Sequence, residues 1–174
     1  VDLLISLGHR RIALLADSMD DKSISELRCR GYRDALEAHD IPFSPAITAR
    51  TGSFSDMRAI YAATRELNER DASFTALFAI ADLMALAAIR ALNDSGRRVP
   101  DDCSVVSIDG LELTQYTLPA LTTFAQPIEE IGVACAATLT DLVKGTGGHR
   151  QYTFEPILRK GESVKKHPIT VIGG

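Results

Sequence analysis

The sequence predicts an α/β protein built on a doubly wound parallel sheet with helices on both faces. Short apolar runs alternate along the chain with segments of helical periodicity, as in successive βα units. The run at residues 76–81 (ALFAIA) is continuously apolar, which is typical of a central parallel strand covered on both faces. The chain has 174 residues, 45% hydrophobic and 24% charged, which suffices for a domain with a buried core.

Each predicted element has a local signal. The predicted strands are short apolar runs bounded by turn residues, at 12–16, 46–51, 76–81, 104–108, 121–124 and 152–157. The predicted helices have apolar residues spaced three or four apart, at 1–7, 23–39, 55–70, 83–93 and 127–144. Because the helical pattern is already present at residue 1, we expect the chain to be a fragment of a longer protein.

Residues suited to helix ends mark the helix boundaries. Ser23 and Glu26 fit a capping box, in which a hydroxyl and a carboxylate each satisfy a free backbone N–H. Ser55 and Asp82 are placed to cap the next two helices, and Pro127 suits the first position of the last one. Glycines suited to C-caps follow three of the helices, namely Gly8, Gly96 and Gly145.

Composition and motifs argue against several classes of function. The net charge of −4 is unlike the basic surface that grips DNA, so this segment is not expected to bind DNA directly. No apolar run is long enough to span a membrane. Catalytic and phosphate-binding motifs are absent and the cysteines lack metal-ligand spacing, so we expect no catalytic residue, metal or cofactor. Cys29, Cys103 and Cys135 are expected to be buried free thiols.

Polar and aromatic side chains follow the predicted strands, at the edge where open parallel sheets bind ligands. Asp17 follows the first strand, Phe54 the second and Asp82 the third. Asp109 follows the fourth, and Arg28 lies on the helix after the first. Carboxylates and guanidinium groups bind hydroxyl pairs, and a ring stacks on the C–H face of a sugar or on a base. The set therefore indicates a small ligand with hydroxyls and one flat apolar face.

Each of these residues also has a structural interpretation. The pattern alone favours a helix N-cap for Asp82 and a solvated helix position for Arg28. Phe54 could pack over the end of the sheet, and Asp109 could be a turn former because it precedes Gly110. The local pattern leaves these alternatives open.

Five segments occur in order between residues 3 and 163. They are residues 7–15 (LGHRRIALL), 28–32 (RCRGY), 75–87 (TALFAIADLMALA), 99–110 (VPDDCSVVSIDG) and 119–127 (PALTTFAQP). Together they resemble the effector-binding domain of lactose-repressor (LacI/GalR) family proteins, which are bacterial transcription regulators. The resemblance covers nearly the whole chain.

The resemblance implies a two-lobed fold of the type I periplasmic-binding-protein kind, of which this chain holds mainly the C-terminal lobe. In this division residues 9–126 form the C-terminal lobe, 127–156 are an excursion into the N-terminal lobe, and 157–163 return to the C-terminal lobe. Residues 1–8 end an N-terminal-lobe or connecting helix, and 164–174 are a tail. The DNA-binding head and most of the N-terminal lobe would lie outside the chain.

The resemblance also implies roles for individual residues. Arg28 matches the arginine that binds effector hydroxyls or a carboxylate, and Phe54 matches the aromatic residue that stacks on the effector. Asp109 matches the aspartate that accepts hydrogen bonds from the effector. Gln126 matches a position near the cleft floor, and Asp82 is a further candidate for effector binding.

Two departures from the family pattern remove polar contacts. Ala81 stands where many sugar-binding members have Asn or Asp, and Ile24 stands where several have Ser or Thr. These departures weaken the expectation of a sugar but not that of a small ligand, and they indicate an effector that is smaller, less hydroxylated or differently oriented. A sugar-like effector is still favoured over a purine.

The leading hypothesis is the effector-sensing domain of a cytoplasmic, homodimeric repressor that reaches its DNA operator only through the missing N-terminal head. A periplasmic sugar-binding protein of a transport system shares the expected fold and is the alternative. An α/β enzyme with Asp109 or Asp17 as base is the least favoured. The sequence upstream of residue 1 would distinguish the first two, as a helix-turn-helix or a signal peptide.

Overall fold

The computed structural model describes residues 1–17, 23–148 and 150–168, and its centre is one six-stranded sheet. The strand order is β2-β1-β3-β4-β5-β6. The first five strands are parallel and β6 is antiparallel to β5. The strands are β1 (Ile12–Asp17), β2 (Thr48–Thr51), β3 (Ala76–Ala79), β4 (Ser104–Asp109), β5 (Thr122–Ala125) and β6 (Ile157–Arg159). The predicted α/β class with a mostly parallel sheet is confirmed.

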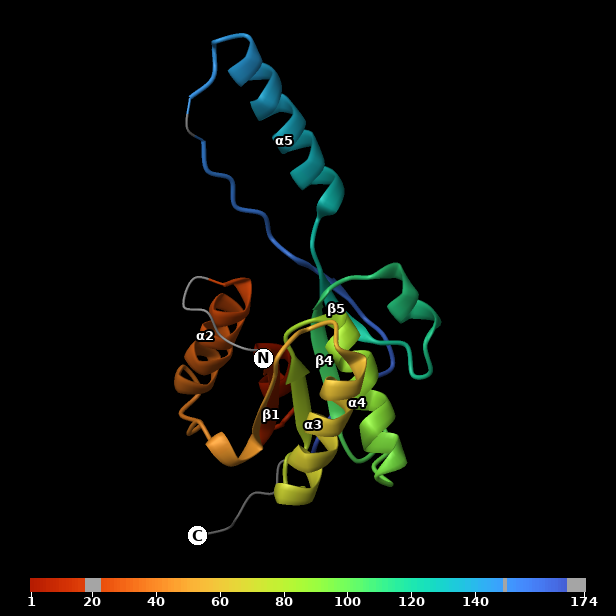
Figure 1. Cartoon of the computed structure of the whole chain (residues 1–174). Helices are drawn as coiled ribbons and strands as arrows, with labels where there is room; N and C mark the ends of the chain where they lie inside the picture. The colour runs from red at the N-terminus through yellow and green to blue at the C-terminus, as the bar shows by residue number, and fades with distance from the viewer. Residues whose placement is uncertain (18–22, 149, 169–174) are drawn as a thin grey trace.

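Helices cover both faces of the sheet (Figure 1). They are α1 (Asp2–Ser6), α2 (Ile24–Glu37), α3 (Met57–Arg70), α4 (Asp82–Asp94) and α5 (Ile128–Val143), with 3-10 turns η1 (Pro45–Ile47) and η2 (Glu112–Tyr116). Helices α3 and α4 pack together on one face, and α2 lies on the other. On that second face the ring of Tyr32 stacks on Phe78 with centroids 6.3 Å apart. Within the described residues, no helix combines the length and apolar character that a bilayer span needs.

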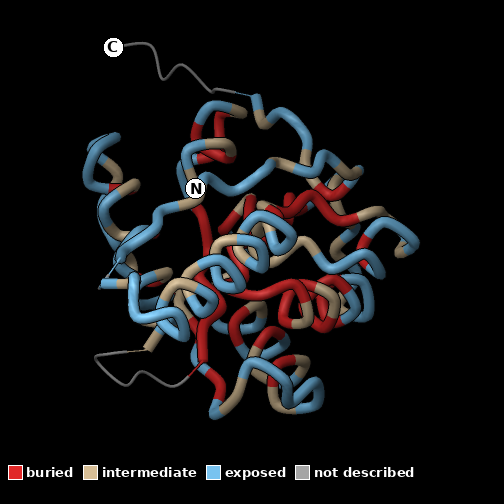
Figure 2. Tube along the Cα trace, turned by 90° about the horizontal axis from the view of Figure 1, so that it is seen from above, coloured by how far each residue is buried: buried red, intermediate tan, exposed pale blue. Residues whose placement is uncertain are grey.

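The core lies along the strands and under α4. Strand β1 is buried along its whole length, as are all four residues of β3. Figure 2 shows the buried residues gathered in the centre of the molecule. Cys29 and Cys103 are buried free thiols, as predicted, but Cys135 is exposed because it lies on α5, which buries none of its residues in this chain.

The structure bears out one half of the predicted capping box and corrects the other N-terminal predictions. Ser23 caps α2, since its side chain accepts a hydrogen bond from the Glu26 N–H, but the Glu26 carboxylate lies 3.5 Å from Arg33 Nη1 and does not complete the box. Pro127 is the N-cap of α5 and not its first helical residue. Helix α3 is capped by Asp56 instead of Ser55, because the Asp56 carboxylate accepts from two free N–H groups of the first turn. The N-cap of α4 is Ala81, and Asp82 is already the first helical residue. The carboxylate of Asp82 instead accepts hydrogen bonds from side chains of β4 and β5.

The last strand is shorter and later than predicted, spanning Ile157–Arg159 instead of residues 152–157. The alternating pattern of residues 152–154 comes from Tyr152 and Phe154, whose rings stack with centroids 6.2 Å apart. Together with α5 they line an apolar hollow. Their apolar surface therefore faces a helix, and the sheet begins only where the chain returns to β5.

Helix α5 projects from the body of the molecule (Figure 1). The chain leaves the sheet at the end of β5 and returns in β6, where Ala125 and Ile157 are paired neighbours. Helix α5 lies within the predicted excursion at residues 127–156, and the place of that segment in a second lobe stays a prediction.

The C-terminal segment is hydrogen-bonded to residues near the amino ends of the strands. The Ser163 carbonyl accepts a hydrogen bond from the Val105 N–H at 2.7 Å, and the His167 N–H donates to the Leu7 carbonyl at 2.8 Å. His9 is buried there, with Nε2 3.1 Å from the Lys165 carbonyl oxygen and its ring stacked on His167. Burial lowers the pKa of His9. The hydrogen bond to Lys165 opposes this shift, and the charge of His167 adds to it.

Acidification should therefore destabilise the fold through His9. The unfolded state, whose histidine pKa is near 6.5, binds a proton at higher pH than the folded state. Stability that is present above pH 6.5 is lost as the pH falls toward the lower folded pKa, by at most about 1.4 kcal/mol per pH unit. Urea unfolding between about pH 7.5 and 5.5 should give a flatter pH dependence for His9→Gln than for the wild type.

The matched control is Arg30→Gln, which alters an exposed residue of α2 and leaves His9 and its neighbours in place, so acid should lower its stability as steeply as that of the wild type. A His9→Gln protein whose stability falls with acid as steeply as the wild type would contradict the assignment.

Candidate ligand-binding site

Arg28 and Asp109 meet at the carboxyl edge of the sheet. Arg28 lies on α2 and Asp109 ends β4. The Arg28 Nη2 lies 2.7 Å from Asp109 Oδ1, and its Nη1 donates to the Ile80 carbonyl at 2.5 Å. Their side chains are only 18% and 25% exposed. This charge-assisted pair is partly shielded from water, and it fixes the orientation of both side chains.

Gln126 completes the group. Its Nε2 donates to Asp109 Oδ1 at 3.0 Å, and its backbone N–H donates to the Asp109 carbonyl at 3.2 Å. Asp109 Oδ1 therefore accepts two side-chain hydrogen bonds, whereas no described residue donates to its Oδ2. The structure thus brings Arg28, Asp109 and Gln126 together, with one carboxylate oxygen left for another donor.

The backbone that carries Asp109 is strained. Asp109 has a φ of 137°, a value that side chains with a Cβ rarely adopt, and Gly110 follows with a φ of 78°. A Cβ on Gly110 would collide with the Cβ of Ala125, so only glycine fits. Such a conformation persists only where the surrounding structure over-determines it, and it is concentrated at functional sites.

Asp82 lies beneath this turn and is fully buried. Its Oδ1 accepts from Ser107 Oγ at 2.5 Å and from Thr123 Oγ1 at 2.6 Å, and its Oδ2 accepts from the Leu111 N–H at 2.7 Å. These donors come from β4, β5 and the segment after Gly110. The contacts identify Asp82 as a residue that holds the site edge together, while direct contact with a ligand stays a prediction.

Two further residues lie at the same edge on the other side of β3. Asp17 ends β1 with 9% of its surface exposed, and its Oδ1 is buried without a hydrogen-bond partner among the described residues. Phe54 lies in the turn after β2, with 52% of its surface exposed. Its predicted stacking on an effector stays a prediction, because none of the described contacts joins it to Arg28 or Asp109.

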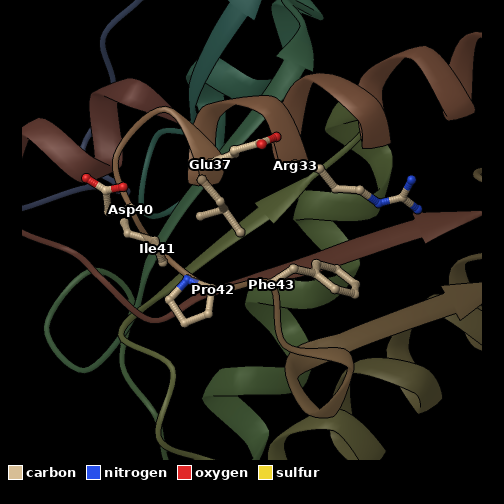
Figure 3. Close-up of a pocket in the computed structure, with 7 residues that line it drawn as sticks. Arg33, Glu37, Asp40, Ile41, Pro42 and Phe43 are labelled. Atoms are coloured by element: carbon tan, nitrogen blue, oxygen red, sulfur yellow. The ribbon is translucent and has the colours of Figure 1, made fainter.

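Figure 3 shows a different hollow, at the end of α2 that is remote from Arg28. Arg33, Phe43 and the loop before η1 line it, with the Arg33 guanidinium 5.7 Å from the Phe43 ring centroid. Because α2 runs back along the sheet after β1, this hollow faces the amino ends of the strands. It lacks the Arg28–Asp109–Gln126 group, which lies at the ligand edge of the fold.

Sequence reasoning missed the partners that orient these residues. The Ile80 carbonyl is a backbone group and has no sequence signal. Ser107 and Thr123 interrupt apolar strands with polar side chains, a signal that could have pointed to a buried partner. In the described ranges, no three His, Cys, Asp or Glu side chains are grouped as a metal site.

Comparison with known proteins identifies the family of the chain. The family model of the periplasmic binding protein-like domain matches residues 1–164. The chain is 40% identical over 154 residues to the HTH-type transcriptional regulator CelR of Thermobifida fusca, an overlap of 88% of this chain and 43% of that protein. It is 38% identical over 161 residues to the HTH-type transcriptional regulator AscG of Escherichia coli K12, over 92% of this chain and 47% of that protein. The chain thus spans less than half the length of these relatives.

Solved structures of transcription regulators superpose on most of the chain. A transcriptional regulator CelR–cellobiose complex superposes with a TM-score of 0.82 at 35% identity, covering 92% of this chain and 49% of that one. A dimeric Lac repressor with an 11-residue C-terminal deletion superposes with a TM-score of 0.85 at 30% identity, covering 94% and 58%.

Removal of the Asp82 carboxylate should destabilise the fold strongly. Asp82→Ala leaves two buried hydroxyls and the Leu111 N–H without their acceptor, so we expect a loss of about 3 kcal/mol in the free energy of unfolding, measured with urea. Asp101→Ala breaks an exposed ion pair with Lys165 and should leave the free energy of unfolding close to that of the wild type. Equal losses in the two variants would show that Asp82 does not organise this edge.

Proposed function

Because the chain belongs to the lactose-repressor branch of the periplasmic binding protein-like family, we propose that it is the effector-sensing part of a bacterial transcription regulator. In this proposal it binds a small sugar or sugar derivative at the edge formed by Arg28, Asp109 and Gln126. The observation that carries the proposal is the preorganised pair of Arg28 and Asp109, whose Oδ2 faces no described donor. A carboxylate oxygen of this kind is suited to a ligand hydroxyl.

The charges at the edge favour a neutral ligand over an anionic one. Asp109 neutralises Arg28, and Asp17 adds a second, buried carboxylate whose Oδ1 lacks a partner in the described chain. A phosphorylated sugar would meet the charge of these two carboxylates, and the Arg28 guanidinium is already paired with Asp109. Cellobiose, with which CelR forms its solved complex, is a neutral sugar and is a suitable first probe.

The lobe assignment is part of the same proposal. Residues 9–126 and 157–163 would form the C-terminal lobe, and 127–156 the excursion that packs in an N-terminal lobe outside this chain. The absence of any buried residue on α5 supports this, since its apolar side chains then gain a partner. The DNA operator would be bound by a separate head in the cytoplasm, and the domain would bind its ligand without turnover.

Asp109→Ala in the full-length protein should weaken cellobiose binding about 10- to 100-fold, or about 1–3 kcal/mol, because the Arg28 guanidinium and the ligand hydroxyls lose their acceptor. Isothermal titration calorimetry measures this. If cellobiose does not bind the wild type, a thermal-shift screen of neutral sugars, sugar phosphates and purines selects the probe.

The matched control is Asp71→Ala, which breaks an Arg–Asp pair of the same 2.7 Å length at the opposite edge of the sheet. It should bind as the wild type does. Unchanged binding by Asp109→Ala would reject the site, and a sugar phosphate that binds more tightly than its neutral sugar would reject the charge argument.

We also propose that the protein is a homodimer, like the dimeric Lac repressor to which it is similar. The segment around η2 exposes large apolar side chains that nothing in the described chain covers, with Leu118 91% and Tyr116 79% exposed. A second copy of the chain is the occupant proposed for this surface.

Leu118→Glu in the full-length protein should shift the sedimentation of a dimer toward the monomer, because a charge on the surface would have to be desolvated on association. Lys166→Glu changes an exposed residue of the C-terminal segment and should leave the dimer intact. A Leu118→Glu protein that stays dimeric at low micromolar concentration would show that another surface pairs.

A further inference from the structure

Arg159 reaches the strained turn of the ligand edge from β6. Its Nη1 donates a 2.6 Å hydrogen bond to the Gly110 carbonyl. Arg159 is the last residue of β6, and its partner across the strands is Thr123 of β5. The bond therefore joins the strand that returns from α5 to the residue next to Asp109.

Three successive residues of the turn are each held by a different part of the fold. The Asp109 carbonyl accepts from the Gln126 N–H after β5, and the Leu111 N–H donates to Asp82 on α4. The Gly110 carbonyl between them accepts from Arg159. Asp109 needs this support because its φ of 137° is unfavourable for a residue with a side chain.

The three residues that bind the turn, Asp82, Gln126 and Arg159, lie on parts of the fold that can move differently. Asp82 is the buried first residue of α4, whereas Gln126 directly follows β5, from which the chain leaves for α5, and Arg159 ends β6, in which the chain returns. A displacement of α5 relative to the sheet acts on both of these strands. It would change the hydrogen bonds at Asp109 and Gly110 and, through the turn, the bond that the Leu111 N–H makes with Asp82.

We propose that Arg159 is a positioning residue for the ligand site, which fixes the turn bearing Asp109 and couples it to the strand returning from α5. The ligand role of Asp109 in this inference rests on the proposed function, but the positioning of the turn does not. Arg159 acts through the Gly110 carbonyl and needs no contact with the ligand.

The test is amide hydrogen exchange at Leu111 in the ligand-free full-length protein, read by mass spectrometry with residue-resolved fragmentation. Arg159→Met removes the donor and should speed exchange at Leu111 about tenfold, because the turn opens more often. Arg159→Lys keeps a cationic donor and should restore slow exchange. Lys160→Met, which alters the neighbouring residue, should exchange as the wild type does.

A melting temperature within a few degrees of the wild type separates this local effect from global destabilisation. Unchanged exchange in Arg159→Met, or equally fast exchange in Arg159→Lys, would overturn the proposal.

A binding measurement with cellobiose distinguishes this inference from the proposed function. If Arg159→Met loosens the turn and weakens cellobiose binding three- to tenfold, both are supported. If it loosens the turn while Asp109→Ala binds normally, the proposed ligand site fails and the positioning role stands. If Asp109→Ala loses binding but the loosened Arg159→Met binds normally, the coupling of Arg159 to the ligand is overturned.

Discussion

A carboxylate buried beneath the ends of three strands must have its oxygens satisfied by protein donors, and Asp82 meets this requirement with Ser107, Thr123 and the Leu111 N–H. The first two donors tie β4 to β5, and the third ties the turn after β4 to the start of α4. Each donor would be left unpaired if its element shifted, so the carboxylate fixes three elements relative to one another. The position of the turn that carries Asp109 at the ligand edge therefore depends on the hydrogen bonds of Asp82.

On that base, the strained conformation of Asp109 becomes tolerable and useful. The turn directs the Asp109 carboxylate toward Arg28, and the guanidinium is held at its other end by the Ile80 carbonyl. A ligand hydroxyl that meets this pair finds both groups already oriented, so little side-chain ordering is required on binding. Preorganisation of this kind gives selectivity for ligands whose hydroxyls match the geometry.

Sequence patterns predicted the parts of the fold whose causes are local. The apolar run at β1, the Ser23 cap of α2 and the strand–helix alternation are read from neighbouring residues, and the structure has them.

The predicted cap role of Asp82 failed because side-chain and backbone donors from distant parts of the chain bind its carboxylate in place of the helix end, and nothing in the local sequence encodes those donors. The same reason hides Arg159, since its partner Gly110 is 49 residues away in the chain. The meeting of Arg28 and Asp109 at one edge was predictable from the parallel strands, whereas Gln126 was suggested only by the family resemblance. The pairing of individual atoms was not predictable, because it depends on backbone carbonyls such as that of Ile80.

The path of the chain gives the proposed regulator a physical means of linking ligand to shape. The residue after β5 and the last residue of β6 each donate a hydrogen bond to the turn of Asp109, namely Gln126 and Arg159. A ligand that binds more tightly to one geometry of this turn must also favour the matching placement of α5, because the two are joined by the same bonds. This coupling is reciprocal. If ligand binding favours one placement of α5 by a given free energy, then a neighbouring lobe that holds α5 in that placement increases the affinity for the ligand by the same free energy.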